Sequence, residues 1–221
     1  NDTSQDLYFT KLAKNFGIEV RYDETQLASI PKNGPLIIVA NHPLSGIDGI
    51  VLGAMIEKVR PDARVVLTSL LKDFKGMSDH SIFINPFGGT AGKAINLFQR
   101  DLMYEHLRQG KSIIIFPSGE VSKKINLSET YAIDPQWKKG VANLIESVPE
   151  TQVVPVFVEG QPSDQLLRYK IEKPNFATIM ILKDLTTRLG EPVELIIGAP
   201  ISAQELHTIP SELSQSPSHK I

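Results

Sequence analysis

The chain has 221 residues, of which 41% are apolar and 22% are charged, and its formal net charge is −2. These values exclude a disordered, collagen-like or coiled-coil protein, and they exclude a general electrostatic attraction for nucleic acid. The absence of cysteine excludes disulfides, thiolate zinc sites and a cysteine nucleophile. A chain of this length can bury roughly 70% of the surface that its unfolded form exposes, so we expect one folded unit with its own core.

An apolar stripe near the N-terminus predicts the first helix. Phe9, Leu12, Ala13 and Phe16 recur at the i, i+3, i+4, i+7 spacing of one helix face, before a terminating Gly17. Such a stripe suits a helix that packs on the core. The alternative is a helix that lies on a membrane surface.

Short apolar and β-branched runs then alternate with helical stretches. Their nearly continuous hydrophobicity indicates strands that are covered on both faces. The predicted strands are Leu36–Asn41, Arg64–Leu70, Ser81–Asn85, Ser112–Phe116, Gln152–Val158 and Val193–Gly198, and the predicted helices between them are Gly49–Val59, Thr90–Gln109, Pro135–Ser147 and Phe176–Arg188. This order predicts the α/β class, with a largely parallel central sheet flanked by helices. We expect a single domain over residues 1–210, followed by a flexible tail over residues 211–221.

A histidine and an aspartate follow the first predicted strand. His42 lies at its carboxyl end, where ligands of open α/β sheets bind, and Asp48 lies six positions later at the start of a helix. Pro43 and Gly46 allow the loop to fold back, so that the carboxylate contacts one imidazole nitrogen and the other faces a cleft. This contact fixes the tautomer and stabilises the imidazolium, which suits a general base. The alternatives are helix capping by Asp48 and a hydrogen-bonded strand end at His42.

The turn after the fourth predicted strand places further polar groups near the same cleft. Pro117 and Gly119 shape a bend that presents Ser118 and Glu120. Glu120 is expected to accept a hydrogen bond from a hydroxyl or amine acceptor or to orient the loop of His42. The equally weighted alternative is a tight turn in which Glu120 caps its own backbone.

A glycine-rich segment follows the third predicted strand. Gly88–Lys93 departs from the spacing of a P-loop, and Ala94 stands where a hydroxyl residue would hold magnesium, so a nucleotide site is not expected. The free amides of Gly88, Gly89 and Thr90 at a helix start suit one phosphate or carboxylate. The alternative is that Thr90 is a simple N-cap.

Other charged and histidine residues give weaker signals. Lys123 and Lys124 are expected either to attract an acidic carrier protein or lipid headgroup, or to be merely solvated. We expect no metal site, because the remaining histidines have no partners at metal-ligand spacing. These are His80, His106, His207 and His219.

The segment Asn41–Gly49 resembles the Asn-His-x₄-Asp hallmark of the glycerophosphate/lysophospholipid acyltransferase superfamily. It looks most like the variant with one more residue between His42 and Asp48, which is found in haemolysin-like and ornithine- or glycine-lipid acyltransferases. Gly46 permits the bulge that this extra residue requires, through its freedom at positive φ. Further segments resemble later blocks of the family in the expected order: Ile82–Pro86 with Gly88–Thr90, Phe116–Ser122, Val153–Val158 and Gly198–Ile201.

The resemblance implies an αβ acyltransferase fold and an acyl thioester co-substrate, carried by coenzyme A or acyl carrier protein, without a further cofactor. It implies His42 as general base and Asp48 as its orienting partner, with no covalent intermediate. The residues expected at the substrates are Asn41, Ser45, Gly46, Asn85, Gly88, Gly89, Thr90, Phe116, Pro117, Ser118, Gly119 and Glu120.

The sequence therefore predicts an enzyme that moves a fatty acyl chain to a hydroxyl or amine of a lipid-like acceptor. No signal peptide and no apolar run of membrane-spanning length is visible, so we expect a cytoplasmic protein that attaches peripherally to the inner face of the membrane. No nucleic-acid partner is expected. The alternatives are a His/Asp-dependent lipid hydrolase and a lipid-binding module that docks through Phe9, Leu12 and Phe16.

Overall fold

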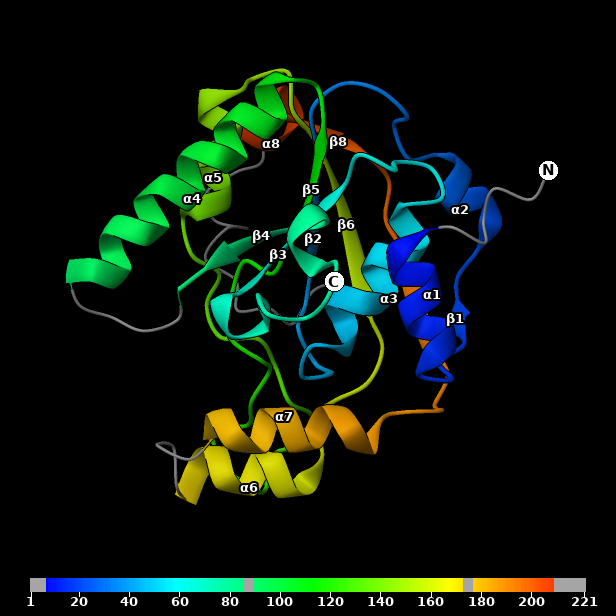
Figure 1. Ribbon diagram of the computed structural model, residues 1–221, viewed down its shortest axis with the longest axis vertical. Coiled ribbons are helices and arrows are strands. Elements are labelled where there is room, and N and C mark those ends of the chain that lie inside the picture. The colour runs from blue at the N-terminus through cyan, green and yellow to red at the C-terminus, as the bar shows by residue number, and fades with distance from the viewer. Residues whose placement is uncertain (1–6, 86–89, 173–176, 209–221) are drawn as a thin grey trace.

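The computed structural model (Figure 1) describes residues 7–85, 90–172 and 177–208. Its strands form one eight-stranded sheet in the order β1-β7-β6-β2-β5-β3-β4, with β8 also paired to β6. The strands are β1 Val20–Arg21, β2 Leu36–Ala40, β3 Arg64–Thr68, β4 Ser81–Ile84, β5 Ser112–Ile115, β6 Gln152–Val158, β7 Val193–Ile197 and β8 Ile201–Ser202. The helices are α1 Tyr8–Asn15, α2 Glu24–Ala28, α3 Ile47–Ile56, α4 Thr90–Arg108, α5 Gly140–Ser147, α6 Asp164–Glu172, α7 Ala177–Thr187 and α8 Ala203–Thr208.

The central strands are parallel, as predicted. β2 pairs in parallel with both β5 and β6, and β3 pairs in parallel with β4 and β5. β7 and β8 pair with β6 in the antiparallel sense. The predicted α/β class with a mostly parallel sheet is therefore confirmed. Because β2, β3, β4, β5 and β6 run the same way, their carboxyl ends meet at one edge, which we call the carboxyl edge.

Both faces of the sheet are covered, which explains why the strands read as continuous apolar runs. Leu36 and Ile38 of β2 belong to the cluster that α1 and α3 complete, whereas Ile37 and Val39 belong to the cluster with α4 and α5. Figure 1 shows α1 and α3 beside one face of the sheet and α4 with α5 beside the other. Since all five residues of β2 are buried, this strand holds the following loop rigidly.

The N-terminal stripe packs on the core, so the membrane-surface alternative for this helix is wrong. The side chain of Phe9 is 2% exposed and lies against α3, where an added Cβ on Gly53 would fall 2.4 Å from the ring. Glu57 completes the contact, because its carboxylate accepts hydrogen bonds from the backbone amides of Phe9 at 3.1 Å and Thr10 at 2.6 Å. An anion at this position satisfies amides that a helix start leaves free.

The starts of two predicted helices are wrong, and several short elements were not predicted. α3 begins at Ile47, two residues before the predicted Gly49. α5 begins at Gly140 and not at Pro135, because buried Asp134 and a bond from the amide of Lys138 to the carbonyl of Pro117 hold the preceding residues in a loop. β1, β8, α2 and α8 are too short to show a periodic pattern in the sequence. α6, with nine residues, was also not predicted. The predicted tail over residues 211–221 lies outside the described residues.

The edge opposite the carboxyl edge, which we call the closed edge, is closed by a buried polar network. Arg60 is 1% exposed; its guanidinium donates to both carboxylate oxygens of Asp62, at 2.9 and 2.8 Å, and to the carbonyl oxygens of Pro31 and Gly110. Asp62 also accepts from the amide of Ser112 at 2.9 Å. Arg60 and these hydrogen bonds outweigh the effect of burial and lower the pKa of Asp62.

No helix within the described ranges combines the length and the apolar character that a membrane span requires.

Candidate active site

His42 and Asp48 meet where β2 leaves the sheet. The Nδ1 atom of His42 lies 2.7 Å from Oδ2 of Asp48, the contact that the sequence predicted. The carboxylate of Asp48 is fully buried, whereas the side chain of His42 is 18% exposed. Because a buried carboxylate beside Nδ1 favours the tautomer with its proton on that nitrogen, Nε2 keeps a free lone pair. The ring is therefore oriented as a base.

The loop between the two residues is shaped around the carboxylate of Asp48. Oδ1 accepts the amide of Leu44 at 2.7 Å, and Oδ2 accepts the amide of Gly46 at 3.2 Å. Gly46 has φ 106° and Ser45 has φ 55°, so two consecutive residues adopt the left-handed conformation. The bulge expected at Gly46 is present, and it also includes a non-glycine residue, which is uncommon. Asp48 thus organises the whole loop besides contacting the imidazole.

The backbone and ring of His42 are fixed by the segment that follows β5. Its amide donates to Oδ1 of Asp134 at 3.1 Å, and its carbonyl accepts the amide of Ser122 at 2.9 Å. The imidazole stacks on the ring of Phe116, with centroids 4.3 Å apart and planes 21° apart. Since Oγ of Ser122 also donates to Asp134 at 2.6 Å, His42 and the segment that follows β5 form one rigid unit.

Asn41, expected at a substrate, is used within the sheet. Its side-chain amide donates to the carbonyl of Val158 at 2.9 Å, and its side-chain oxygen accepts the amide of Val158 at 2.7 Å. The side chain therefore pairs with β6 at the point where the main chain of β2 departs. Ser45 is likewise engaged inside the protein, because its buried hydroxyl donates to Asp184 of α7 at 2.6 Å.

The turn after β5 lies beside His42 but points several of its polar groups elsewhere. The hydroxyl of Ser118 is buried and donates to the backbone carbonyl of Glu120 at 2.8 Å. The side chain of Glu120 lies 3.3 Å from Lys123, and both are about half exposed. Gly119 has φ 66°, and an added Cβ would fall 2.8 Å from Nζ of Lys138. The structure thus brings Phe116 to the imidazole, while Ser118 serves the turn itself.

The glycine-rich segment before and within the start of α4 is described in part. Asn96 of α4 holds the backbone of Asn85, accepting from its amide at 2.6 Å and donating to its carbonyl at 2.9 Å. α4 begins at Thr90, so the residue that precedes the helix is Gly89. Gly88 and Gly89 lie outside the described residues, and their expected role at a substrate stays a prediction.

Three residues that support the site were missed from the sequence: Asp134, Lys170 and Asp184. Lys170 of α6 donates to the carbonyl oxygens of Val121 and Ser122. Ser122 is the residue whose amide binds the carbonyl of His42. Burial lowers the pKa of Lys170 to about 8. These residues act across as many as 139 positions, as Asp184 does on Ser45, so no local spacing could have marked them.

Two cavities flank the loop of His42. A narrow one of about 60 Å³ is lined in part by Gly46 and Gly49, which stand on either side of Asp48 in the sequence. Its other lining residues are apolar: Phe9, Leu12, Phe16, Ile50, Leu67, Leu71, Phe74, Met77 and Leu185. This cavity suits hydrocarbon.

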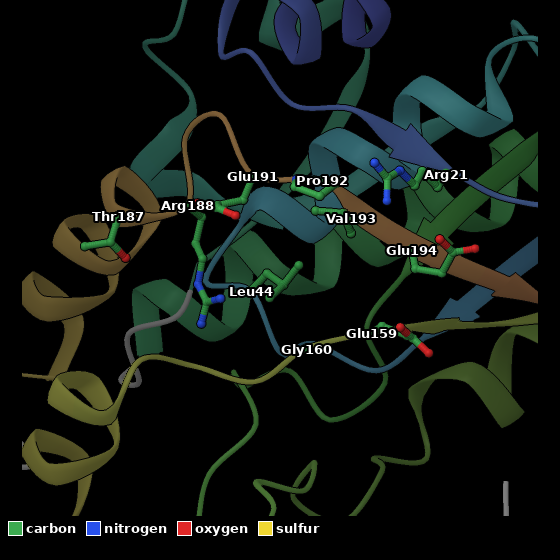
Figure 2. Close-up of a pocket in the computed structure, with 10 residues that line it drawn as sticks. All are labelled: Arg21, Leu44, Glu159, Gly160, Thr187, Arg188, Glu191, Pro192, Val193 and Glu194. Atoms are coloured by element: carbon green, nitrogen blue, oxygen red, sulfur yellow. The ribbon is translucent and has the colours of Figure 1, made fainter.

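The second cavity, of about 510 Å³, lies behind Leu44 on the side of β1 and β7 (Figure 2). Figure 2 shows charged side chains of both signs around it, with Arg188 on one side and Arg21 and Glu194 on the other. Neither His42 nor Asp48 belongs to the lining of either cavity; the smaller one includes Gly46 and Gly49 of their loop, and the larger one includes Leu44.

The family model described as Acyltransferase matches residues 9–212 of the chain. The chain belongs to this family. Within it, the chain is 27% identical over 195 residues to a lyso-glycine lipid O-acyltransferase of Phocaeicola vulgatus, covering 85% of this chain and 66% of that protein. It is 28% identical over 150 residues to a lyso-glycine lipid O-acyltransferase of Bacteroides thetaiotaomicron, covering 66% of this chain and 51% of that protein. The chain thus spans about two thirds of the length of the first relative and about half of the length of the second.

The fold of this acyltransferase-family chain resembles that of a solved structure. The crystal structure of the 1-acyl-sn-glycerophosphate acyltransferase PlsC from Thermotoga maritima matches with a TM-score of 0.54 and 18% identity, over 93% of this chain and 74% of that one. The resemblance to the acyltransferase superfamily and its glycine-lipid branch, first drawn from Asn41–Gly49, is confirmed by the family match and the two relatives.

Proposed function

We propose that this protein transfers a fatty acyl chain from an acyl thioester to a hydroxyl group of a lipid acceptor. The observation that carries the proposal is the His42–Asp48 contact of 2.7 Å, which occupies Nδ1 and leaves Nε2 free in a member of the acyltransferase family. A hydroxyl is favoured over an amine because both curated relatives are named O-acyltransferases.

The reaction follows from the orientation of the ring. Nε2 of His42 accepts the proton of the acceptor hydroxyl as its oxygen attacks the thioester carbonyl. The buried carboxylate of Asp48 stabilises the imidazolium that forms. When the tetrahedral intermediate collapses, the C–S bond breaks and the thiolate takes the proton from Nε2, so the histidine returns to its neutral form. No group of the protein becomes acylated in this sequence.

Hydrocarbon recognition is supported by the apolar cavity beside the pair. Gly46 and Gly49 place no side chain between Asp48 and this space, and an added Cβ on Gly49 would lie 3.2 Å from Leu67. Phe74, which is 53% exposed, stands in its lining and gives it a way out to the surface. We propose that an acyl chain enters along this lining. We propose either coenzyme A or acyl carrier protein as the carrier of the donated acyl chain.

The decisive experiment compares two histidine variants. His42→Ala should lower acyl transfer to lyso-lipid acceptors by about 10²–10⁴-fold, because general-base catalysis contributes that range. The matched control is His80→Ala, which removes an imidazole that stacks on Tyr8 away from the pair. Transfer is measured by mass spectrometry with both thioester donors, and folding by the melting temperature, which should stay nearly unchanged in His42→Ala.

The same assay separates the alternatives. Free fatty acid released without acylated acceptor would favour a hydrolase. Lipid binding without turnover, unaffected by His42→Ala, would favour a lipid-binding module. Equal transfer by His42→Ala and His80→Ala would refute the assigned base. We further propose peripheral attachment at the cytoplasmic face of the membrane, where a lipid acceptor is accessible.

A further inference from the structure

Most of the large exposed apolar side chains lie on segments that leave the carboxyl edge of the sheet. These segments follow the carboxyl ends of β3, β4, β5 and β6, and the remaining side chains lie within β6 and on the chain around β7. They are Leu70, Phe74, Ile95, Leu97, Phe98, Leu102, Ile125, Leu127, Tyr131, Trp137, Phe157, Ile171, Leu189 and Ile196. Among the described residues, none belongs to the loops of the opposite edge, at residues 29–35, 57–63, 109–111 and 148–151.

The two most exposed of them, Ile125 and Tyr131, belong to one loop, the β5–α5 loop, residues 123–139. Lys123 and Ile133 pair through two backbone hydrogen bonds of 2.9 and 3.0 Å, which close a neck. Beyond the neck, Ile125 and Tyr131 are each 75% exposed and Leu127 is 46% exposed. Side chains of this size, gathered at a tip, mark a surface that meets another apolar phase.

The neck of this loop is fastened to the catalytic histidine. Ser122, which precedes the loop, binds the carbonyl of His42, and Asp134, next to Ile133, accepts the amide of His42. The tip is therefore in a fixed relation to the imidazole. Whatever holds the tip also sets where His42 lies.

The charges of the β5–α5 loop point to an anionic bilayer. It carries Lys123, Lys124, Lys138 and Lys139 against Glu129 and the buried Asp134, in a chain whose net charge is −2. Trp137 is 42% exposed beside two of the lysines. Tryptophan, tyrosine and lysine around apolar side chains are the pattern of a membrane–water interface, where lysines bind anionic headgroups. A protein partner would explain the lysines, but it does not require apolar residues at so narrow a tip.

We propose that the β5–α5 loop is the membrane-docking surface of this protein, inserting Ile125, Leu127 and Tyr131 into an anionic leaflet. Docking there holds His42 at the height of the headgroups, so an acceptor can present its hydroxyl without leaving the bilayer. The proposal rests on the proposed function for the identity of the substrate, but binding to vesicles is measurable without turnover.

The test compares two double variants of the full chain that each remove two exposed apolar side chains. Ile125→Ser with Leu127→Ser changes the tip, and the matched control Ile95→Ser with Phe98→Ser changes the outer face of α4. Sedimentation with vesicles of phosphatidylethanolamine and phosphatidylglycerol is expected to show a partition coefficient lower by about tenfold or more for the tip variant, and nearly unchanged for the control. Lys124→Gln with Lys139→Gln should weaken binding to the same vesicles, but not the weaker binding to phosphatidylcholine alone.

The outcomes separate the surface from the function. Unchanged vesicle binding by a folded tip variant, or loss confined to the α4 variant, would overturn the proposal. Unchanged vesicle binding together with a higher KM for acyl carrier protein would assign the loop to the donor and overturn it as well. If His42→Ala retains vesicle binding while the tip variant loses it, the surface stands whether or not transfer is found.

Discussion

The two edges of the sheet each bring a histidine and an aspartate together, and they use them differently. At the closed edge, Nε2 of His106 donates to the carbonyls of Asp62 and Ser112, at 3.0 and 3.1 Å, and burial lowers its pKa. At the carboxyl edge, His42 is bound through Nδ1 and its ring remains partly exposed. Residue types alone do not distinguish a structural network from a site. The difference lies in which nitrogen the protein itself occupies.

The aspartates differ in the same way. Asp62 faces the guanidinium of Arg60, a permanent charge, so its carboxylate is compensated at all times. Asp48 faces an imidazole, which carries no charge until it takes a proton, and two backbone amides, so its compensation increases when the ring is protonated. The closed edge thus holds a permanent ion pair, whereas the proposed function requires a change of charge at the carboxyl edge. Three variants test this comparison.

The largest expected effect is that of Asp48→Asn on activity. An amide in place of Oδ2 would present a donor to Nδ1 and to the amide of Gly46, which favours the wrong tautomer of His42. We expect transfer to fall by about 10²–10⁴-fold, with a loss of roughly 1–3 kcal/mol in the free energy of unfolding. Steady-state kinetics and urea denaturation measure the two effects. A variant with normal turnover would show that the carboxylate merely shapes the loop.

The closed edge should respond in the opposite manner. Arg60→Met leaves Asp62 without its cation and leaves the carbonyls of Pro31 and Gly110 without a donor. We expect a loss of roughly 3 kcal/mol in the free energy of unfolding, with kcat unchanged at temperatures where the variant is folded. The same denaturation and kinetic assays apply. A fall in kcat at full folding would mean that the two edges are coupled.

The smallest expected effect is a change in pH dependence at Lys170. Because burial lowers its pKa from 10.5 to about 8, the folded protein binds fewer protons than the unfolded chain between these values. The free energy of unfolding of the wild type should therefore rise, relative to Lys170→Met, as the pH increases from about 8 to 10.5. Denaturation at several pH values measures the difference. Parallel pH profiles for the two proteins would contradict the burial of this amine.

The sequence was informative wherever the deciding interactions are local. The apolar run of β2 marks a strand covered on both faces, and the six-residue interval from His42 to Asp48, with Gly46 inside it, leads to the observed contact. The stripe of Phe9 and Ala13 marks a helix on the core.

The contacts that were missed join distant parts of the chain. The site is supported from a loop by Asp134 and from the α6–α7 pair by Lys170 and Asp184. The sequence around each of these residues does not indicate which distant residue it contacts. Ser118 was expected to face the cleft, but its hydroxyl donates to the carbonyl oxygen of Glu120 two residues later, a local bond that serine often makes within a turn.

The pairing of Asn41 with Val158 has a consequence for a reaction on lipids. When one strand ends before its neighbour, the last peptide groups of the neighbour lose their hydrogen-bonding partner, and water usually binds them instead. Here the carboxamide of Asn41 takes the place of that water. The N–H and C=O groups of Val158 therefore keep their hydrogen bonds when the surrounding water is displaced. Under the proposed function, a lipid can therefore displace water beside His42 without leaving the peptide groups of Val158 unpaired.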